Sequence, residues 1–439
     1  MQYFGTDGIR GNVEKFLTPS LVTKIGYATG EAFSKEGITK VCIGKDPRIS
    51  SHFIMDLLSG TLIAKGIDVI DLGVVSTPII SYTILDNEDI EVGIMISASH
   101  NPYTDNGIKF FGKDGKKIAE KVELEIEEEI QKENIAINLH QIGTRIKDNK
   151  YVEHYINYLI AQSQDLQGLK IALDCANGSA SKIAPIIFER LNAEVKVVGN
   201  EPNGYNINQD VGSTSTKNFQ NFIKDGNFDF GFSYDGDADR VMLIDQDGEL
   251  LDGDYIIYLL AKYFKGNKEL INEAIVSTVM TNLGFKKAIK NINVQNYETS
   301  VGDKYVMREL DKQKLNLGGE QSGHIIISNL LPTGDGILTS VILAKIFKEL
   351  PNYLQEIRNE LIQYPQRLVN YKCDNKQRIM SDENLQTYIT ELSEEIGDNG
   401  RILVRPSGTE ELIRIMVEHQ KIEKCDKIIQ SIIEKIKKI

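Results

Sequence analysis

Three aspartates at alternate positions give the clearest chemical signal in this chain, in the segment Asp235-Gly236-Asp237-Ala238-Asp239-Arg240. The segment directly follows the apolar run 228–234, which we expect to be a strand, and ligands bind at the carboxyl ends of strands in open α/β sheets. Three carboxylates can share one ion, and donors that are all oxygen favour magnesium over zinc or copper. An Asp-rich surface turn is the alternative. A calcium EF-hand loop is excluded, because Arg240 and Gln246 stand where it requires Gly and Glu.

A serine, Ser99, follows a second expected strand, residues 92–96, in the segment Ser97-Ala98-Ser99-His100-Asn101-Pro102. A serine at a strand end, next to His100 and a rigid proline, is suited to nucleophilic work, and we take both residues as catalytic candidates. The Gly-x-Ser-x-Gly elbow of hydrolases is absent. An ordinary turn is the alternative. However, a phosphorylated serine carries about −2 charge and hard oxygens, which a three-aspartate magnesium site lacks as a further ligand.

Two more polar loops follow expected strands. Arg405-Pro406-Ser407-Gly408-Thr409-Glu410 combines a guanidinium with two hydroxyls and an open glycine backbone, the parts of a small phosphate nest. Glu320, Ser322 and His324 lie on a glycine-rich loop, residues 318–324, and can exchange hydrogen bonds with neighbouring sugar hydroxyls. A structural turn is the alternative for each loop. The Walker pattern and a complete G-x-G-x-x-G are both missing, so nucleotide binding has no support.

Together these loops supply a nucleophile, a metal site, a sugar-binding acid and a fixed phosphate site. The segments 5–11 and 107–109 add Arg10 and Lys109 as cations near the serine, and a solvated surface charge is the alternative for each. One phosphate held at Arg405 and another carried on Ser99 imply a sugar that is phosphorylated at two positions during turnover. That is the chemistry of a mutase.

The elements that must position these loops alternate between apolar β-branched runs and segments of helical period. Three such blocks predict tandem α/β domains with mostly parallel sheets, and a smaller α+β domain follows them. We expect a phosphoserine-loop domain at residues 1–150, a metal-loop domain at 151–250, a sugar-loop domain at 251–364 and a phosphate-binding domain at 365–439. Expected strands are 40–44, 68–72, 92–96, 170–174, 194–198, 228–234, 274–279, 293–297, 314–317, 402–405 and 413–418. Expected helices include 50–64, 181–191, 285–289 and 383–396.

Composition limits the partners and the compartment. The 439 residues carry a net charge of −13, which disfavours nucleic acids and anionic membranes as partners but still permits a small sugar phosphate in a local cationic cleft. The apolar share is 41%, and no run of about 18 apolar residues suggests a membrane span. Four scattered cysteines and an N-terminus without an export signal favour a cytoplasmic protein. The oligomeric state stays open, with a homodimer as one option.

In order and spacing, these motifs and Phe4-Gly5-Thr6-Asp7-Gly8-Ile9-Arg10-Gly11 resemble the α-D-phosphohexomutases across the whole chain. The resemblance implies four domains around a central cleft, with Ser99 as the phosphoserine. It implies one Mg²⁺ held by Ser99 through its phosphate and by Asp235, Asp237 and Asp239. It also implies sugar contacts from Glu320 and Ser322. A phosphate site would comprise Arg405, Ser407, Gly408, Thr409 and Arg414. A transfer site would comprise Arg10, Lys109, Arg240 and His324, with Lys109 or His324 assisting proton transfer.

Within this family, the segments 3–8, 96–102 and 319–324 look most like the branch that acts on glucosamine phosphates. The expected reaction interconverts glucosamine 6-phosphate and glucosamine 1-phosphate, with glucosamine 1,6-bisphosphate as intermediate and activator. A glucose or mannose phosphate mutase is the nearest alternative. A non-catalytic sugar-phosphate sensor and a magnesium-dependent phosphatase are alternatives from other classes.

Overall fold

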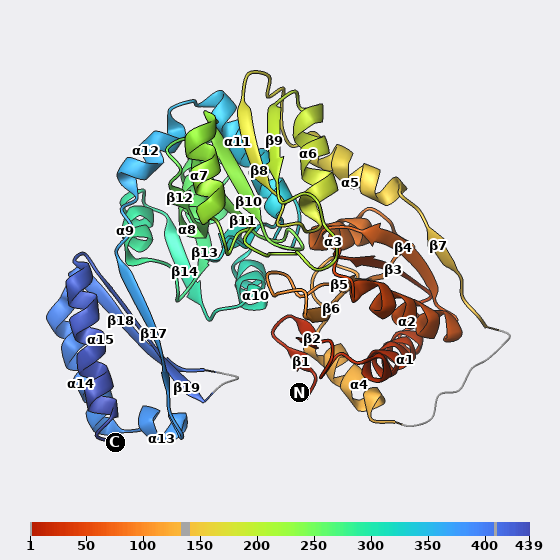
Figure 1. Ribbon diagram of the computed structural model, residues 1–439, viewed down its shortest axis with the longest axis horizontal. Helices are drawn as coiled ribbons and strands as arrows, with labels where there is room; N and C mark the ends of the chain where they lie inside the picture. Colours follow the sequence, from red (N-terminus) through yellow and green to blue (C-terminus); the bar gives the residue numbers. More distant parts are fainter. Residues whose placement is uncertain (1, 133–140, 408–410) are drawn as a thin grey trace. The chain divides into compact units, whose positions relative to one another are not determined.

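The computed structural model describes residues 2–132, 141–407 and 411–439 (Figure 1). It divides into two compact units, one of residues 1–280 and 294–357 and the other of residues 281–293 and 358–439. Among the described residues, the first unit contains three sheets and the second contains one. No helix in the described part of the chain is long and apolar enough to cross a membrane.

The first sheet combines parallel and antiparallel strands. Its order is β1 (Phe4–Gly5), β2 (Gly8–Asn12), β6 (Asp105–Phe111), β5 (Val92–Ile96), β3 (Lys40–Lys45), β4 (Asp68–Val74) and β7 (Arg145–Lys147). Strands β5, β3, β4 and β7 run parallel. Helices α1 (Pro19–Lys35), α2 (Ser51–Ala64) and α4 (Glu120–Ile130) share one apolar core on one face, and α3 (Thr77–Leu85) packs on the other. Every residue of β5 is buried, as expected for a strand covered on both faces.

The second and third sheets repeat this plan with fewer strands. The second has the order β12 (Leu250–Leu251), β11 (Val241–Asp245), β10 (Phe230–Tyr234), β8 (Lys170–Asp174) and β9 (Glu194–Val198). Its helices are α5 (Lys150–Ile160), α6 (Ala180–Arg190) and α7 (Lys217–Gly226). The third has the order β14 (Gln295–Thr299), β13 (Ala274–Thr278), β15 (Leu317–Gly319) and β16 (Ile325–Ile327). Its helices are α8 (Gly253–Gly266), α10 (Asp303–Gln313) and α11 (Gly336–Glu349), with a 3₁₀ turn η1 (Ile271–Glu273) before β13 and α12 (Tyr353–Glu360) after α11.

The expected tandem α/β architecture is confirmed, but each of these sheets also carries antiparallel strands that the sequence pattern did not predict. Strands β6, β11 and β16 turn back directly after β5, β10 and β15 and pair with them. The Ser99 loop, the three-aspartate loop and the Glu320 loop are therefore hairpin connections. Each begins at the carboxyl end of a parallel strand, where open α/β sheets bind their ligands.

The second unit is α+β, as expected. Its antiparallel sheet has the order β17 (Gln366–Lys372), β19 (Leu412–His419) and β18 (Gly400–Pro406). Helix α15 (Ile422–Ile436) buries Cys425, Ile429, Ile432 and Ile436, whose spacing gives one apolar stripe. This stripe and α14 (Glu383–Ile396) pack against the sheet in one core. The remaining helices of this unit are α9 (Leu283–Asn291), α13 (Lys376–Met380) and the 3₁₀ turn η2 (Gly397–Asn399).

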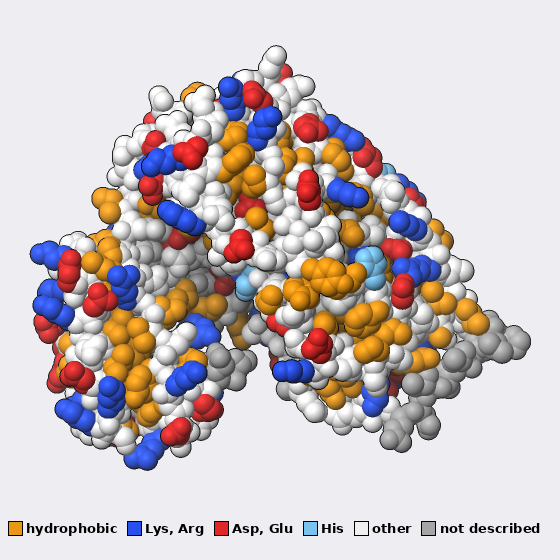
Figure 2. Space-filling view, viewed as in Figure 1, with side chains coloured by type: hydrophobic (Ala, Val, Ile, Leu, Met, Phe, Trp, Pro, Cys, Tyr) orange, Lys and Arg blue, Asp and Glu red, His pale blue; other side chains and the backbone are white. Residues whose placement is uncertain are grey.

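On the face shown in Figure 2, Lys and Arg side chains are interspersed with Asp and Glu side chains, and neither sign forms a continuous field. The net charge of −13 is therefore not concentrated in one visible acidic surface.

Candidate active site

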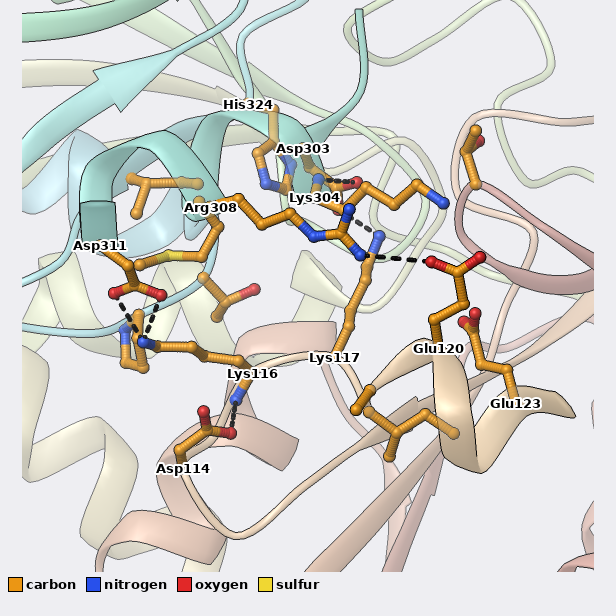
Figure 3. A pocket seen from close by; sticks show the side chains of 17 residues that line it. Asp114, Lys116, Lys117, Glu120, Glu123, Asp303, Lys304, Arg308, Asp311 and His324 are labelled. Atoms are coloured by element: carbon orange, nitrogen blue, oxygen red, sulfur yellow. Dashed lines mark hydrogen bonds and ion pairs between the residues drawn. The ribbon is translucent and has the colours of Figure 1, made fainter. Parts of the chain in front are cut away.

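A pocket of about 280 Å³ opens in the first unit beside several predicted residues, between the segment 114–123 and helix α10 (Figure 3). Ion pairs span it. Lys117 pairs with Asp303, Lys116 Nζ lies 2.7 Å from Asp311 Oδ1, and Arg308 lies 3.7 Å from Glu120. Thr6 and His324 also line this pocket. These ion pairs join the segment 114–123, which follows the first sheet, to helix α10 of the third sheet at the edge of the candidate site.

The hairpin loop between β5 and β6 holds Ser99 in a buried position. Ser99 is 1% exposed, and its φ of 53° lies in the left-handed region that non-glycine residues rarely adopt. Its hydroxyl donates a hydrogen bond to Asp235 Oδ2 at 2.5 Å, and His100 Nδ1 lies 3.3 Å from the same hydroxyl oxygen. Burial, together with the charges of Arg240 and Arg10, lowers the pKa of His100 to about 4. The imidazole next to the nucleophile is therefore neutral near pH 7.

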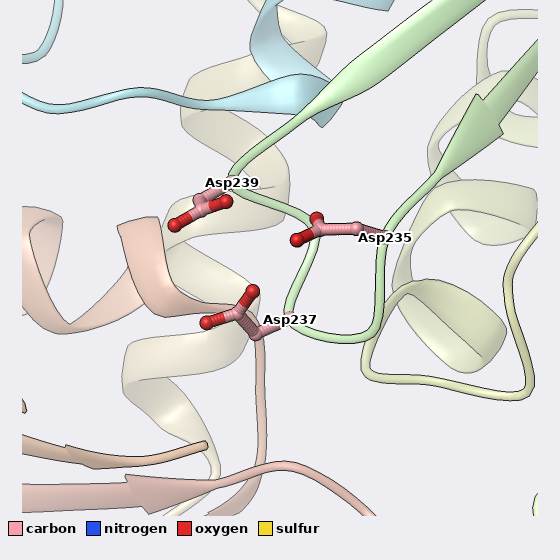
Figure 4. A group of neighbouring side chains, drawn as sticks. All are labelled: Asp235, Asp237 and Asp239. Atoms are coloured by element: carbon pink, nitrogen blue, oxygen red, sulfur yellow. The ribbon is translucent and has the colours of Figure 1, made fainter. Parts of the chain in front are cut away.

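The hairpin loop between β10 and β11 gathers the three carboxylates (Figure 4). Asp235, Asp237 and Asp239 are buried, and one oxygen of each lies within 4.8 Å of the others. Burial, followed by the charges of Asp239 and Asp237, raises the pKa of Asp235 well above its ordinary value. Asp237 Oδ1 is buried and has no hydrogen-bond partner among the described residues. A compact set of oxygen donors with an unpaired buried acceptor fits a small, hard divalent cation, so this cluster is a candidate metal site.

Thr77, the first residue of α3, fixes the middle carboxylate of this cluster from the first sheet. Its backbone N–H donates to the Asp237 carbonyl oxygen at 2.9 Å, and its hydroxyl donates to Asp237 Oδ2 at 2.6 Å. The predicted metal loop is thus bonded to the module that carries Ser99. Thr77 belongs to none of the motifs that the sequence shows.

Three carboxylates surround the ammonium group of Lys109, which β6 brings into the site. Its Nζ lies 2.7 Å from Asp237 Oδ2, 3.2 Å from Asp239 Oδ2 and 3.3 Å from Asp7 Oδ2. Burial alone would lower the pKa of Lys109, but these carboxylates raise it above its ordinary value, so the ammonium stays charged. Arg10 pairs with Asp7, which keeps a second cation at the same place.

Arg240 and His324 complete the group of basic side chains around Asp239. Arg240 Nε lies 3.8 Å and His324 Nδ1 lies 3.7 Å from Asp239 Oδ1. Burial would lower the pKa of His324, but its interaction with Asp239 raises it. A Cβ at Gly334 would come within 2.3 Å of the His324 ring, so the glycine leaves the space that the imidazole occupies.

The hairpin loop between β15 and β16 carries the residues predicted to bind sugar. Glu320 is 7% exposed, and its Oε1 accepts a hydrogen bond from the backbone of Gly302 at 3.0 Å. The hydroxyl of Ser322 is buried and has no hydrogen-bond partner in the described part of the chain. Burial would lower the pKa of Arg240, but the charges of Asp239, Asp235 and then Glu320 raise it above its ordinary value. The loop thus presents acceptor and donor groups near the cationic cluster.

In the second unit, two arginines stand opposite each other on paired strands. Arg405 on β18 and Arg414 on β19 are register partners, on the face of the sheet opposite Ile413 and Ile415, which pack into the helical core. Burial and the charge of Arg414 lower the pKa of Arg405. Like charges directly opposite each other destabilise a sheet, so an anion bound between them would relieve the repulsion. Ser407, which follows β18, is buried. Gly408 and Thr409 lie outside the described residues.

The Arg240 N–H donates to Asp235 Oδ1 at 3.2 Å and so links the serine to the cationic cluster. The structure thus joins one set of predicted residues in a single network of the first unit: Ser99, His100, Asp235, Asp237, Asp239, Arg10, Lys109, Arg240 and His324. Sequence reasoning missed Thr77, Arg48 and Asn208, which bond to the backbone or side chains of these loops. Arg48 lies in the loop that follows strand β3, and the rule that ligands gather at strand ends could have drawn attention to it. No local signal distinguishes Asn208.

Four successive family models match the chain, those of phosphoglucomutase/phosphomannomutase α/β/α domain I (residues 1–136), domain II (149–248), domain III (252–364) and the C-terminal domain (368–435). The chain therefore belongs to the phosphoglucomutase/phosphomannomutase family and is an isomerase of the mutase type.

Within this family, the chain is most like the phosphoglucosamine mutases. It is 43% identical to "Phosphoglucosamine mutase" of Bacillus cereus (strain B4264), over 99% of this chain and 98% of the relative. A phosphoglucomutase/phosphomannomutase family protein of Burkholderia thailandensis has the same fold, with a TM-score of 0.82, 20% identity and coverage of 98% of this chain and 96% of that one. The Aspergillus fumigatus N-acetylphosphoglucosamine mutase, solved with GlcNAc-6P and magnesium, has a TM-score of 0.73 at 17% identity, with coverage of 98% and 94%.

Proposed function

We propose that the protein interconverts glucosamine 6-phosphate and glucosamine 1-phosphate, with Ser99 as the carrier of the phosphoryl group. The observation that carries this proposal is the hydrogen bond of 2.5 Å from the Ser99 hydroxyl to Asp235 in the buried carboxylate cluster. A nucleophile joined to a cation site suits a phosphoserine that is both phosphoryl donor and metal ligand. The names of the curated relatives at 43% identity support glucosamine as the sugar.

The proposed transfer starts from phosphorylated Ser99. A hydroxyl oxygen of the bound sugar phosphate forms a bond to phosphorus while the bond from phosphorus to Ser99 Oγ breaks. The sugar hydroxyl gives up its proton and the serine oxygen gains one, so the products are glucosamine 1,6-bisphosphate and free Ser99. The bisphosphate then reorients, and the reverse step returns its other phosphoryl group to Ser99. In such transfers the protein mainly positions the groups and stabilises their charge.

We propose Mg²⁺ as the cation of the carboxylate cluster. Asp235, Asp237, Asp239 and an oxygen of phosphorylated Ser99 would hold it, which is the all-oxygen set that this ion prefers. When bound, Mg²⁺ supplies positive charge against the oxygens of the phosphoryl group. The structure of the A. fumigatus enzyme, which has the same fold, contains magnesium.

The basic side chains around the cluster have different proposed roles. Lys109 and Arg10 stay charged, so they suit holding the oxygens of the moving phosphoryl group. His324 and the neutral His100 can accept and return a proton, and His100 lies 3.3 Å from the Ser99 oxygen that must gain one. The raised pKa keeps Lys109 protonated, which makes it a weaker candidate than His324 for proton transfer.

Glu320 and Ser322 are proposed to bind the sugar, and the arginine pair of the second unit its non-reacting phosphate. A carboxylate accepts hydrogen bonds from sugar hydroxyls and also from the ammonium group of glucosamine, which a neutral hexose lacks. Arg405 and Arg414 provide two adjacent guanidinium groups for a dianion, with Ser407, Gly408 and Thr409 proposed as further donors.

The substrate assignment is tested by measuring kcat/KM for the 6-phosphates of glucosamine, glucose and mannose, each with a catalytic amount of its own 1,6-bisphosphate. We expect glucosamine 6-phosphate to be preferred by at least about tenfold, which corresponds to about 1.4 kcal/mol. The family description, which names phosphoglucomutase and phosphomannomutase, makes a neutral-hexose mutase the second candidate. A higher kcat/KM for glucose or mannose 6-phosphate would overturn the assignment of the sugar and leave the mutase reaction in place.

A further inference from the structure

The backbone conformation of Ser99 requires support from outside its own loop. A left-handed conformation costs a non-glycine residue about 1–2 kcal/mol, and such conformations persist where the surrounding structure determines them. Within the loop, the Ser99 N–H donates to Ser97 Oγ at 2.9 Å, and the Asn101 N–H donates to the Ala98 carbonyl oxygen at 3.1 Å. The carbonyl groups of Ser99 and Asn101 are held by two residues that belong to none of the predicted motifs.

Arg48 is the first of these residues. It lies between β3 and α2, is fully buried, and pairs with Asp46. Its Nη2 donates to the carbonyl oxygen of Ser99 at 3.0 Å and to that of Asn101 at 2.5 Å. Asp46 also accepts a hydrogen bond from Ser51 Oγ at 2.9 Å, which holds this carboxylate in place. The guanidinium is therefore bound through Nη1 to Asp46 and through Nη2 to the two carbonyl groups.

Asn208 is the second, and it comes from the module of the second sheet. Its Nδ2 donates to the carbonyl oxygen of Ser99 at 2.9 Å and to that of Asn101 at 3.0 Å. Its own backbone is left-handed, with a φ of 59°, and its N–H donates to the Ala176 carbonyl oxygen at 2.9 Å. Two donors from two different modules therefore converge on the same two carbonyl groups.

This convergence exceeds what hydrogen-bond satisfaction requires, because one donor is enough to satisfy a buried carbonyl group. The four contacts instead fix the Ser99–His100 and Asn101–Pro102 peptide planes, and the first of these planes helps to set the direction of the Ser99 side chain. Neither Arg48 nor Asn208 contacts the Ser99 hydroxyl itself in the hydrogen bonds of the described residues.

We propose that Asn208, together with Arg48, is a positioning residue that holds the Ser99 oxygen in line for phosphoryl transfer across the boundary between the first and second sheets. This inference rests on the proposed function in naming Ser99 as the phosphoryl carrier. Misplacement of a reacting group by about 1 Å can cost about 100-fold in rate. The loss of this support therefore lowers kcat and leaves the binding of the sugar phosphate unchanged.

The test uses Asn208→Gly, because glycine keeps the left-handed backbone and removes only the side chain. Asn227→Gly is the matched control: Asn227 has a φ of 54°, follows α7, and lies outside the Ser99 network. A third variant, Asn208→Asp, keeps the shape of the side chain but turns an oxygen instead of an N–H toward the two carbonyl oxygens. For all proteins, kcat and KM are measured on the hexose 6-phosphate that the wild type converts fastest, and hydrogen exchange of the peptide spanning 97–104 is measured by mass spectrometry.

We expect Asn208→Gly to lower kcat by about 30- to 100-fold with KM changed less than about threefold. Exchange of the 97–104 peptide should accelerate in this variant and not in Asn227→Gly. Asn208→Asp should lower kcat at least as much as Asn208→Gly, whereas a role in filling space alone would make it the milder change.

The inference is overturned if Asn208→Gly and Asn227→Gly have equal kcat, if Asn208→Asp retains the wild-type kcat, or if exchange at 97–104 is the same in all proteins. The exchange measurement needs no substrate, so it decides the matter even if the chain proves inactive. Preference of the wild type for a neutral hexose would refute the proposed sugar and leave these comparisons valid. Arg48→Lys, which keeps a charge for Asp46 but offers one compact donor group, gives an independent check with the same expected direction.

Discussion

Asp335 links the stability of the first unit to pH. It caps α11, where its Oδ1 accepts hydrogen bonds from the backbone of Ile337 at 3.0 Å and of Leu338 at 2.9 Å. Its Oδ2 accepts the hydroxyl of Tyr155 on α5 at 2.7 Å. The next residue, Gly336, donates its N–H to the Ala238 carbonyl oxygen at 3.0 Å, so this helix end supports the metal loop. Burial raises the pKa of Asp335 from 3.8 to about 6.

The sign of the pH dependence follows from this shift. The folded protein binds the Asp335 proton more tightly than the unfolded chain, so the contribution of this proton to stability is complete below about pH 4 and is lost as pH rises through about 6. With these two pKa values, linkage gives a loss of about 1.4 kcal/mol of unfolding free energy between about pH 5 and about pH 7.5. Other groups titrate in the same range, so the quantity to compare is the difference between the wild type and a variant.

The variant is Asp335→Asn, which keeps the capping oxygen and the size of the side chain but does not titrate. Urea unfolding of both proteins is followed by circular dichroism at the two pH values. We expect the stability of the wild type, relative to that of the variant, to fall by about 1.4 kcal/mol from the lower to the higher pH. An equal pH dependence in the two proteins would refute the reasoning, since Asp335 would then ionise in the folded protein as it does in water.

Two further substitutions test the charged parts of the site. Lys109→Met leaves Asp237 and Asp239 buried without their ammonium partner, so in EDTA the unfolding free energy should fall by about 3–5 kcal/mol, and added Mg²⁺ should restore more stability to this variant than to the wild type. An equal effect of Mg²⁺ on both proteins, measured by urea unfolding, would speak against a cation site at these carboxylates. Arg414→Gln removes the repulsion with Arg405, so the unfolding free energy should stay constant or rise by about 0.5 kcal/mol, while KM for the sugar phosphate should rise about 10- to 100-fold. Steady-state kinetics and urea unfolding check the two directions, and a loss of stability with an unchanged KM would exclude Arg414 from phosphate binding.

The strands that carry the motifs were predictable because their apolar runs are continuous and bounded. The expected ranges 92–96, 170–174 and 194–198 agree with β5, β8 and β9, and the expected helix 383–396 agrees with α14. Strand β16, with the sequence Ile325–Ile327, escaped prediction because three residues are too short to reveal a period. Because β6, β11 and β16 were not predicted, the sequence indicated loops at the ends of β5, β10 and β15 but not that these loops connect hairpins.

The residues that carry the chemistry of the site were also easier to predict than the residues that hold them in place. Ser99 and the three aspartates have residue types and spacings that suggest a reaction, and the resemblance to a family added their roles. Thr77, Arg48 and Asn208 act through hydrogen bonds to residues 51 to 160 positions away, and no local pattern records such contacts. Lys109 was expected as a cation, but its three carboxylate neighbours became evident only from the pairing of β6 with β5 and the position of the β10–β11 loop.

The most direct test follows the fate of a labelled phosphoryl group on Ser99. The protein is loaded with ³²P from labelled hexose 1,6-bisphosphate, freed of excess label, and mixed with glucosamine 6-phosphate and Mg²⁺ in a rapid-quench experiment. We predict that the label is on the peptide containing Ser99, leaves it within one turnover, and appears in glucosamine bisphosphate and monophosphate. Label released as inorganic phosphate would indicate a phosphatase. A protein that takes up no label, or a Ser99→Ala variant that turns over as fast as the wild type, would contradict Ser99 as the phosphoryl carrier.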